Sequence, residues 1–206
     1  MRGLAGAILA LCLLALSAGA VTVPRPAHEF VIRGPGGEAL LSQYRGKVVL
    51  LAFIFTTCPH CQHSVGIMSG LQNEYGPRGF QALGSAFNEM AAQLLPSFLT
   101  QFHPSFPVGY AARATVLEYL QTPSNFPLSV PVLVFIDKKG IIRSQHMGSD
   151  DPFFKDQEKS MRAELEALLK EPGPGRRNRS TWSQSGDWRS QGERWRRSQK
   201  YNFSAN

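Results

Sequence analysis

The sequence predicts a single α/β domain in which a central mixed β-sheet is flanked by helices. The order of expected elements is β-α-β, then a helical insertion, then β-β-α, without an internal repeat. Residues 47–55 are almost continuously apolar, which is typical of a central strand covered on both faces. A chain of 206 residues, 43% of them hydrophobic, can bury one ordinary core.

Turn signals and hydrophobic periodicity place the individual elements. Gly34-Pro35-Gly36-Gly37 is expected to turn one short strand back on the next, and Pro59 suits the first position of a helix. Pro172-Gly173-Pro174-Gly175 ends the last helix. Strands are expected at 29–32, 39–41, 47–55, 80–87, 132–136 and 141–146, and helices at 59–75, 89–102, 113–120 and 154–170. A short extended piece at 107–110 is expected to separate the second and third helices.

The first twenty residues are expected to be a secretory signal peptide. Arg2 gives a positive n-region, residues 4–16 form an apolar run, and Ala18-Gly19-Ala20 fits a small-residue cleavage site. An uncleaved membrane anchor is the alternative, because the run approaches the length of a membrane span. The expected organisation is an exported, periplasmic or otherwise extracytoplasmic protein with a signal peptide at 1–20, a spacer at 21–26, a folded domain at 27–171 and a tail at 172–206.

The formal net charge of +7 comes mostly from that tail. From Pro172 onward, eight Arg and Lys residues stand against two acids, which gives +6 and leaves about +1 for the rest of the chain. All three tryptophans lie in the same segment. A polar, basic segment without apolar periodicity is expected to be disordered. The nearly neutral domain gives no reason to expect nucleic-acid binding.

The chemistry of the chain is concentrated in a Cys-x-x-Cys pair, Cys58 and Cys61, which follows the apolar strand and begins a helix. Unpaired backbone N–H groups and the helix dipole stabilise a thiolate there. A thiolate attacks disulfides, and the second thiol can resolve the mixed disulfide. Export leaves these two as the cysteines of the mature chain. One close pair in an oxidising compartment indicates redox work rather than a structural disulfide framework.

Four segments together resemble the thioredoxin-like superfamily, and within it the exported TlpA/ResA-type thiol–disulfide oxidoreductases. They are the strand-entry segment 41–51, the tetrapeptide Cys58-Pro59-His60-Cys61, the segment 129–137 around Pro131, and the hairpin return 140–143. The resemblance covers about residues 27–170. It implies a thioredoxin-like fold with the helical insertion between the Cys-x-x-Cys helix and a cis-proline loop. It also implies a monomeric enzyme, without cofactor or metal, that exchanges disulfides with protein thiols and depends on an upstream redox partner.

The same resemblance gives roles to individual residues. Cys58 is expected to be the exposed nucleophile and Cys61 the more buried resolving thiol of a redox disulfide. Pro131 is expected to be cis and to lie against that disulfide, an ordinary edge-strand proline being the alternative. The backbone of Val130 would bind a substrate strand, with Pro59 as a second substrate contact. His60, between the cysteines, would favour the thiolate and make the disulfide more oxidising.

The direction of exchange stays open on the sequence. The Cys-Pro-His-Cys tetrapeptide and Val130 are similar to those of DsbA-type oxidases, whereas the overall resemblance favours a reductase. Three departures from the related families also appear: Ala52 replaces a buried Asp, Ser64 a Glu, and Thr57 a Trp. Without a nearby carboxylate, the proton of the resolving thiol must go to water, His60 or another group.

Metal binding is the main alternative chemistry. The two cysteines and His63 have ligand-like spacing, and His103 or His146 could complete a site. SCO-type copper proteins have a related fold, although their cysteines are normally one residue further apart. A peroxiredoxin-like antioxidant protein is a weaker alternative. It would need a Thr three residues before its reactive cysteine, where this chain has Phe55.

Overall fold

The computed structural model describes residues 22–148 and 151–174. The predicted signal peptide at 1–20 therefore lies outside the described residues, as does the predicted tail apart from residues 172–174. In the ranges that are described, no helix is both long and apolar enough to cross a membrane.

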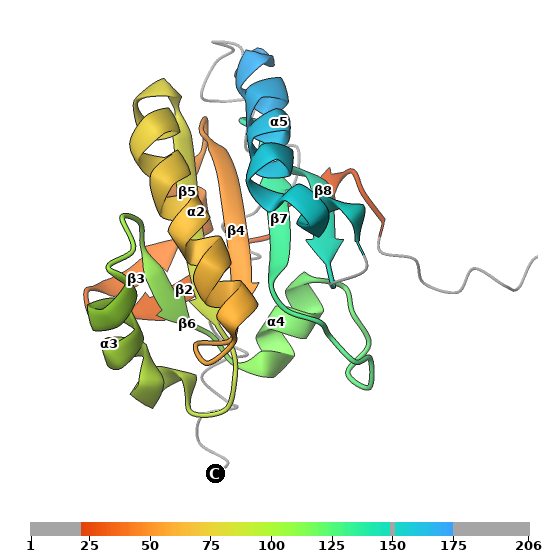
Figure 1. Cartoon of the computed structure of the whole chain (residues 1–206). Coiled ribbons are helices and arrows are strands. Elements are labelled where there is room, and N and C mark those ends of the chain that lie inside the picture. Colours follow the sequence, from red (N-terminus) through yellow and green to blue (C-terminus); the bar gives the residue numbers. More distant parts are fainter. Residues whose placement is uncertain (1–21, 149–150, 175–206) are drawn as a thin grey trace, which may run out of the picture.

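Eight strands of the described residues form one mixed sheet in the order β1-β8-β7-β4-β5-β6-β2-β3 (Figure 1). The central strand β4 pairs in parallel with β5 and antiparallel with β7. The strands are β1 (Arg25–Pro26), β2 (Val31–Gly34), β3 (Gly37–Leu40), β4 (Val48–Ile54), β5 (Phe80–Ala86), β6 (Val108–Tyr110), β7 (Val132–Ile136) and β8 (Ile141–Met147).

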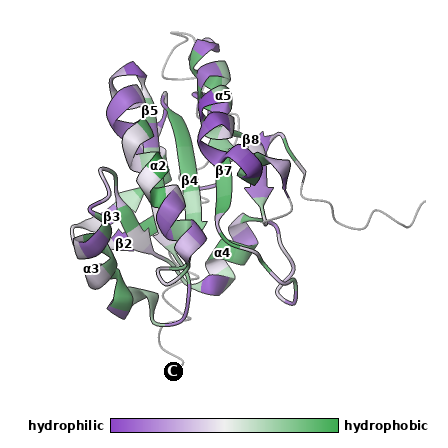
Figure 2. Cartoon of the chain, viewed as in Figure 1, coloured by the Kyte–Doolittle hydropathy of each residue, from purple (hydrophilic) through white to green (hydrophobic). Residues whose placement is uncertain are grey.

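Helices cover both faces of this sheet. The helices α2 (Pro59–Tyr75), α3 (Ala91–Phe102) and α5 (Gln157–Lys170) pack on one face, and α4 (Arg113–Tyr119) packs on the other. Because side chains alternate along a strand, β4 contributes Leu50 to the first core and Leu51 to the second, and all seven of its residues are buried. Figure 2 shows the apolar strands β4 and β7 between helices whose outer surfaces are largely polar. The predicted central strand is confirmed.

The helices α2 and α5 lie side by side on the same face of the sheet (Figure 1). Two ion pairs connect α5 to the end of α2 away from the cysteines and to the short helix after it. Arg162 Nη1 of α5 is 2.6 Å from Glu74 Oε2 of α2. Arg78, in the short 3-10 helix η3 (Gly76–Arg78) after α2, binds Glu166 of α5 through both Nη atoms, at 2.8 and 3.0 Å. All four side chains are between 33% and 49% exposed, so these pairs are accessible to solvent.

The expected spacer at 21–26 needs a correction, because its last two residues form β1. This strand lies at the sheet edge and pairs antiparallel with β8, with Arg25 opposite Ile142. Arg25 is buried and donates to the carbonyl oxygen of Tyr119 and to Gln145 Oε1. A two-residue strand that contains a proline is too short to show an alternation of apolar and polar residues, so the sequence pattern did not predict it.

The extended piece expected at 107–110 is confirmed as β6, which joins the sheet by pairing with both β5 and β2. One further boundary differs from the expectations. The last helix begins at Gln157 rather than at 154. Residues before it form the 3-10 helix η4 (Pro152–Asp156), in which the Asp151 side chain accepts the Phe153 N–H, and Asp156 then caps α5 by accepting the Lys159 N–H.

His146 connects β8 to η4 and α5. Its Nδ1 lies 2.9 Å from Asp151 Oδ2, its Nε2 lies 2.6 Å from Glu164 Oε1, and its ring stacks on Phe153 with the centroids 4.0 Å apart. Burial alone would lower the pKa of His146. The hydrogen bonds and charges of Glu164 and Asp151 outweigh burial, so its pKa is raised above 6.5.

This arrangement predicts a pH-dependent stability. A histidine whose pKa is higher in the folded than in the unfolded chain stabilises the fold while it is protonated, so the stabilisation is full below pH 6.5 and is lost as the pH rises through the folded pKa. We expect the free energy of unfolding, measured by urea denaturation, to fall above pH 6.5 in the wild type and to fall less in His146→Gln. The exposed His28 provides the control, and His28→Gln should keep the wild-type slope. Equal slopes for wild type and His146→Gln would contradict the prediction.

Candidate active site

Cys58 lies at the point where the chain turns from β4 into α2. It is the N-cap residue of α2 and Pro59 follows at the first helical position, where a missing N–H costs no hydrogen bond. The Cys58 carbonyl accepts the Gln62 N–H at 3.0 Å, so the helix starts directly after the thiol. Cys58 is half-buried, whereas Cys61 is fully buried one turn later. Both thiols are free, so the structure describes the dithiol form.

Side chains from neighbouring elements hold the turn that carries Cys58. The Thr56 N–H donates to Asn88 Oδ1 at 2.9 Å, and the Thr56 hydroxyl donates to the same oxygen at 3.3 Å. Gln62 Nε2 donates to the Thr56 carbonyl at 2.9 Å. Both backbone polar groups of Thr56 are therefore bonded at the point where the strand ladder ends, and this fixes the approach to Cys58.

The register of the sheet brings the predicted proline loop to the same place. Val132 of β7 lies opposite Phe53 of β4, so Val130 and Pro131 lie beside the chain that leaves β4. The Val130–Pro131 peptide bond is cis, as expected, and Pro131 is buried. Within the described ranges, the N–H and C=O of Val130 form no hydrogen bond.

Burial controls the ionisation of the Cys61 thiol. Burial raises the pKa of the Cys61 thiol far above its usual range, and the adjacent Cys58 sulfur raises it further through a hydrogen bond and its charge. The Phe55 N–H, 3.5 Å from Cys61 Sγ, acts in the opposite direction but is weaker than burial. Cys61 therefore stays protonated at neutral pH and can donate to a Cys58 thiolate. In the described part of the chain, no carboxylate contributes to this shift, and the fully buried Ala52 leaves none on β4.

Behind the cysteines, Ser64 makes two side-chain hydrogen bonds. Its hydroxyl donates to the His60 carbonyl at 2.8 Å and accepts from Gln157 Nε2 at 2.7 Å. Ser64 is fully buried and Gln157, the first residue of α5, is 9% exposed. A polar contact thus joins the first turns of α2 and α5 at the cysteine end.

A cleft of about 410 Å³ opens beside this contact. Three parts of the chain meet around it: the cysteine-bearing half of α2, the cis-proline loop, and the segment from η4 into α5. Ile67, Val130 and Phe154 give it apolar surface, and Lys155 and Glu158 give it charged groups. His60 and Pro131 both line it, so the cleft lies next to the turn that carries the cysteines, although neither cysteine lines it.

The family of this chain follows from its similarity to known proteins. The Redoxin family model matches residues 23–165, which is more than half of the chain. The chain belongs to the Redoxin family. Thioredoxin-like protein YneN of Bacillus subtilis is 27% identical to this Redoxin protein over 125 residues, covering 60% of this chain and 70% of the relative. Thiol-disulfide oxidoreductase ResA of Geobacillus kaustophilus is 31% identical over 125 residues, covering 60% and 68%.

Solved structures agree on the fold. A thiol:disulfide interchange protein of the thioredoxin family from Chlorobium tepidum superposes with a TM-score of 0.60 at 20% sequence identity, covering 73% of this chain and 99% of that one. The predicted thioredoxin-like fold is therefore confirmed. This Redoxin protein is a thioredoxin-like thiol–disulfide oxidoreductase of the TlpA/ResA type.

The histidines considered as metal ligands are dispersed in the Redoxin protein. His63 is exposed on α2, His103 ends α3, and His146 is bonded to two carboxylates. Among the residues that the structure describes, no group of three His, Cys, Asp or Glu side chains is placed to hold a metal ion.

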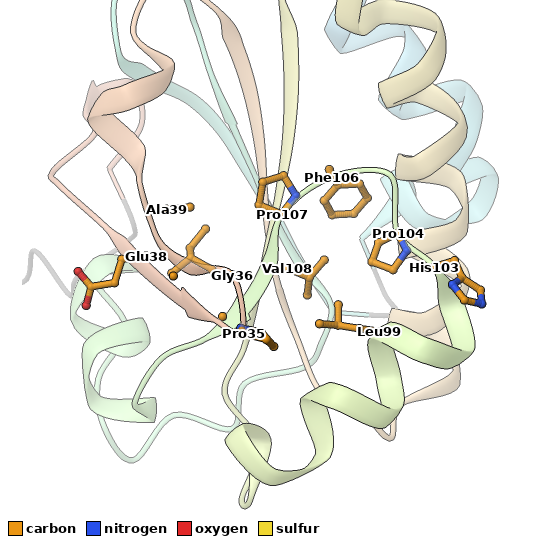
Figure 3. A pocket seen from close by; sticks show the side chains of 13 residues that line it. Pro35, Gly36, Glu38, Ala39, Leu99, His103, Pro104, Phe106, Pro107 and Val108 are labelled. Carbon is orange, nitrogen blue, oxygen red and sulfur yellow. The ribbon is translucent and has the colours of Figure 1, made fainter.

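A second cleft, of about 580 Å³, is separate from the redox pair (Figure 3). It lies between the β2–β3 turn and the segment that follows α3, and Pro35, Leu99 and Phe106 are among its lining residues. Neither cysteine nor the cis-proline lines it. Of the two clefts, the one of about 410 Å³ is the one bordered by His60 and the cis-proline.

Proposed function

We propose that this Redoxin protein is an exported protein-disulfide reductase that works through the Cys58–Cys61 couple. The observation that carries the proposal is the pairing of a half-buried thiol at a helix N-terminus with a fully buried thiol beside a cis-proline loop. Export is supported by the signal-like pattern of residues 1–20, which would serve as a membrane tether if it is not cleaved.

The reaction proceeds in two exchanges. The Cys58 thiolate attacks a protein disulfide, so that a Cys58–substrate S–S bond forms, the substrate disulfide breaks, and the departing substrate sulfur takes up a proton. Cys61 then gives up its proton to water and attacks the Cys58 sulfur, so that the Cys58–Cys61 bond forms and the Cys58–substrate bond breaks. The second substrate sulfur leaves as a thiolate and takes up a proton from water. Two electrons pass to the substrate, and an upstream protein dithiol restores the reduced pair.

The loop at Val130 would bind the substrate. Its unbonded N–H and C=O groups suit the main chain of an extended segment, which would pair with them as an added strand. Pro59, which is exposed and follows Cys58 directly in the chain, would make a second contact. Substrate side chains next to the reacting cysteine would enter the adjoining cleft of about 410 Å³.

Oxidation of protein thiols is the second candidate direction, and His60 is the observation that favours it. This side chain is exposed in the first turn of α2, between the two cysteines. An imidazole there favours the thiolate, which stabilises the reduced pair and makes the disulfide more oxidising. The reductase direction is supported by the likeness to the relatives, which covers far more of the chain than one tuning residue.

Equilibration of the pure protein with glutathione buffers tests the direction. A reduction potential near that of thioredoxin, about −270 mV, supports a reductase, and a value near about −120 mV supports an oxidase. We expect His60→Ala to make the pair more reducing by roughly 30 mV, which is a tenfold change in the equilibrium constant. His63→Ala, also on the exposed surface of α2, is the matched control and should shift the potential less. An unchanged potential in His60→Ala would show that the helix terminus alone sets it.

A further inference from the structure

A buried hydrogen-bond chain runs from α5 to the first turn of the active-site helix. We propose that Gln157 is a positioning residue for the redox pair: acting through Ser64, it holds the first turn of α2 and increases the fraction of Cys58 present as thiolate. The inference rests on the proposed function, because it concerns the equilibrium of the same two cysteines.

The donor-to-acceptor direction of this hydrogen-bond chain follows from the groups that form it. The His60 carbonyl can only accept, so the Ser64 hydroxyl must donate to it across the 2.8 Å contact. The Ser64 oxygen then accepts, and Gln157 must supply an amide N–H across the 2.7 Å contact. Both donors therefore point from α5 toward the turn that contains the cysteines.

Burial strengthens the hydrogen-bond chain. Ser64 is fully buried and Gln157 is 9% exposed, so little water competes for either hydrogen bond. Hydrogen bonds in series polarise one another, and they are electrostatically stronger in a buried environment than in water. Gln157 is itself held in place as the first residue of α5, whose N-cap Asp156 accepts the Lys159 N–H. The hydrogen-bond chain thus holds together two segments that lie 93 positions apart in the sequence.

The His60 carbonyl belongs to the turn that carries both thiols. Its oxygen is a negative partial charge close to the helix N-terminus, where positive potential stabilises the Cys58 thiolate. A hydroxyl donor that Gln157 polarises offsets that negative charge. The reduced pair, with Cys58 ionised, is stabilised as a result, and the disulfide becomes more oxidising.

Packing alone does not explain an amide at this position. The apolar contact between the two helices and the sheet comes from buried side chains further along, among them Met68 and Leu71 of α2 and Met161 and Leu165 of α5. Burying an amide is unfavourable unless its hydrogen bonds are made, so an apolar residue would serve packing better. What the amide adds at this site is a donor aimed at Ser64.

Replacing Gln157 with methionine tests the proposal, because methionine has nearly the same length and no donor. We expect the equilibrium with glutathione to shift about threefold toward the reducing side, which is about 14 mV at 29.6 mV per decade. The pH midpoint for alkylation of Cys58 should rise in the same variant. Ser64→Ala should give a similar shift, and the double variant no more than the larger single shift, because both residues act in one chain. Gln101→Met, at an exposed glutamine of α3, is the control and should leave the equilibrium unchanged.

Two results would overturn the proposal. One is a folded Gln157→Met protein that keeps the wild-type equilibrium with glutathione and the wild-type alkylation profile. That outcome would assign Gln157 a structural role only, even if urea denaturation showed a loss of stability. The other is full additivity of the two substitutions. If Gln157→Met does not fold, Ser64→Ala alone provides the test, and an unchanged equilibrium with glutathione in that variant would contradict the proposal. A wild-type protein that does not equilibrate with glutathione would instead overturn the proposed function.

Discussion

A Cys58→Ser protein is expected to lose disulfide-reducing activity by about 10³-fold or more, which is the scale of effect that removal of a nucleophile has in enzymes. A serine hydroxyl does not ionise near neutral pH and cannot form the mixed disulfide. Cys58 is half-buried and makes no side-chain capping bond to α2, so the substitution should leave the fold intact.

The rate of thiol release from a model protein disulfide measures this effect, with urea denaturation as the control for folding. A wild-type protein that is no more active than Cys58→Ser, and that binds one Cu(I) per chain, would contradict the redox function. That result would favour the copper-binding alternative in spite of the dispersed histidines.

A Cys61→Ser protein is expected to trap its substrate. Cys58 can still open the substrate disulfide and release one substrate thiol, but no second sulfur is left to attack the mixed disulfide. Turnover should therefore stop after a burst of one thiol per protein molecule. Intact-mass measurement under non-reducing conditions should show one substrate attached through Cys58.

The pair of variants also tests the division of roles between the thiols. The proposed roles rest on burial, since Cys61 is fully buried and a raised pKa keeps it protonated. Trapping by Cys58→Ser, together with none by Cys61→Ser, would mean that the roles are reversed. Trapping by neither variant would show that the pair does not pass through a mixed disulfide.

Local sequence patterns were sufficient to predict most of the fold. α2 and β7 have the bounds expected from the sequence, because a proline begins the helix and five apolar residues in a row are readable without tertiary information. β1 was missed for the opposite reason. Two residues become a strand only because β8 lies beside them, and Arg25 is buried only because Tyr119 and Gln145 accept its hydrogen bonds.

The same distinction applies to the candidate site. Cys58, Cys61 and the cis bond before Pro131 were expected from short motifs and from a family resemblance. Asn88 and Gln157 were not, because each contacts the site through a single side-chain amide from a distant element. No spacing or periodicity marks such residues. Ser64 was noticed only as a departure from a family pattern, and its partner became visible with the packing of α5 on α2.

Ionic strength acts unequally on the two ends of the α2–α5 pair. The Arg162–Glu74 and Arg78–Glu166 pairs are solvent-accessible, and salt screens such charges over a distance of about 8 Å at physiological concentration. The Gln157–Ser64 contact is buried and carries no net charge, so dissolved ions leave it unchanged. The proposed export would place the protein in a medium whose salt concentration the cell does not control. With the neutral contact at the reactive end, we expect the alignment of the thiols to stay constant while the ion pairs at the far end of the helix pair weaken or strengthen with the medium.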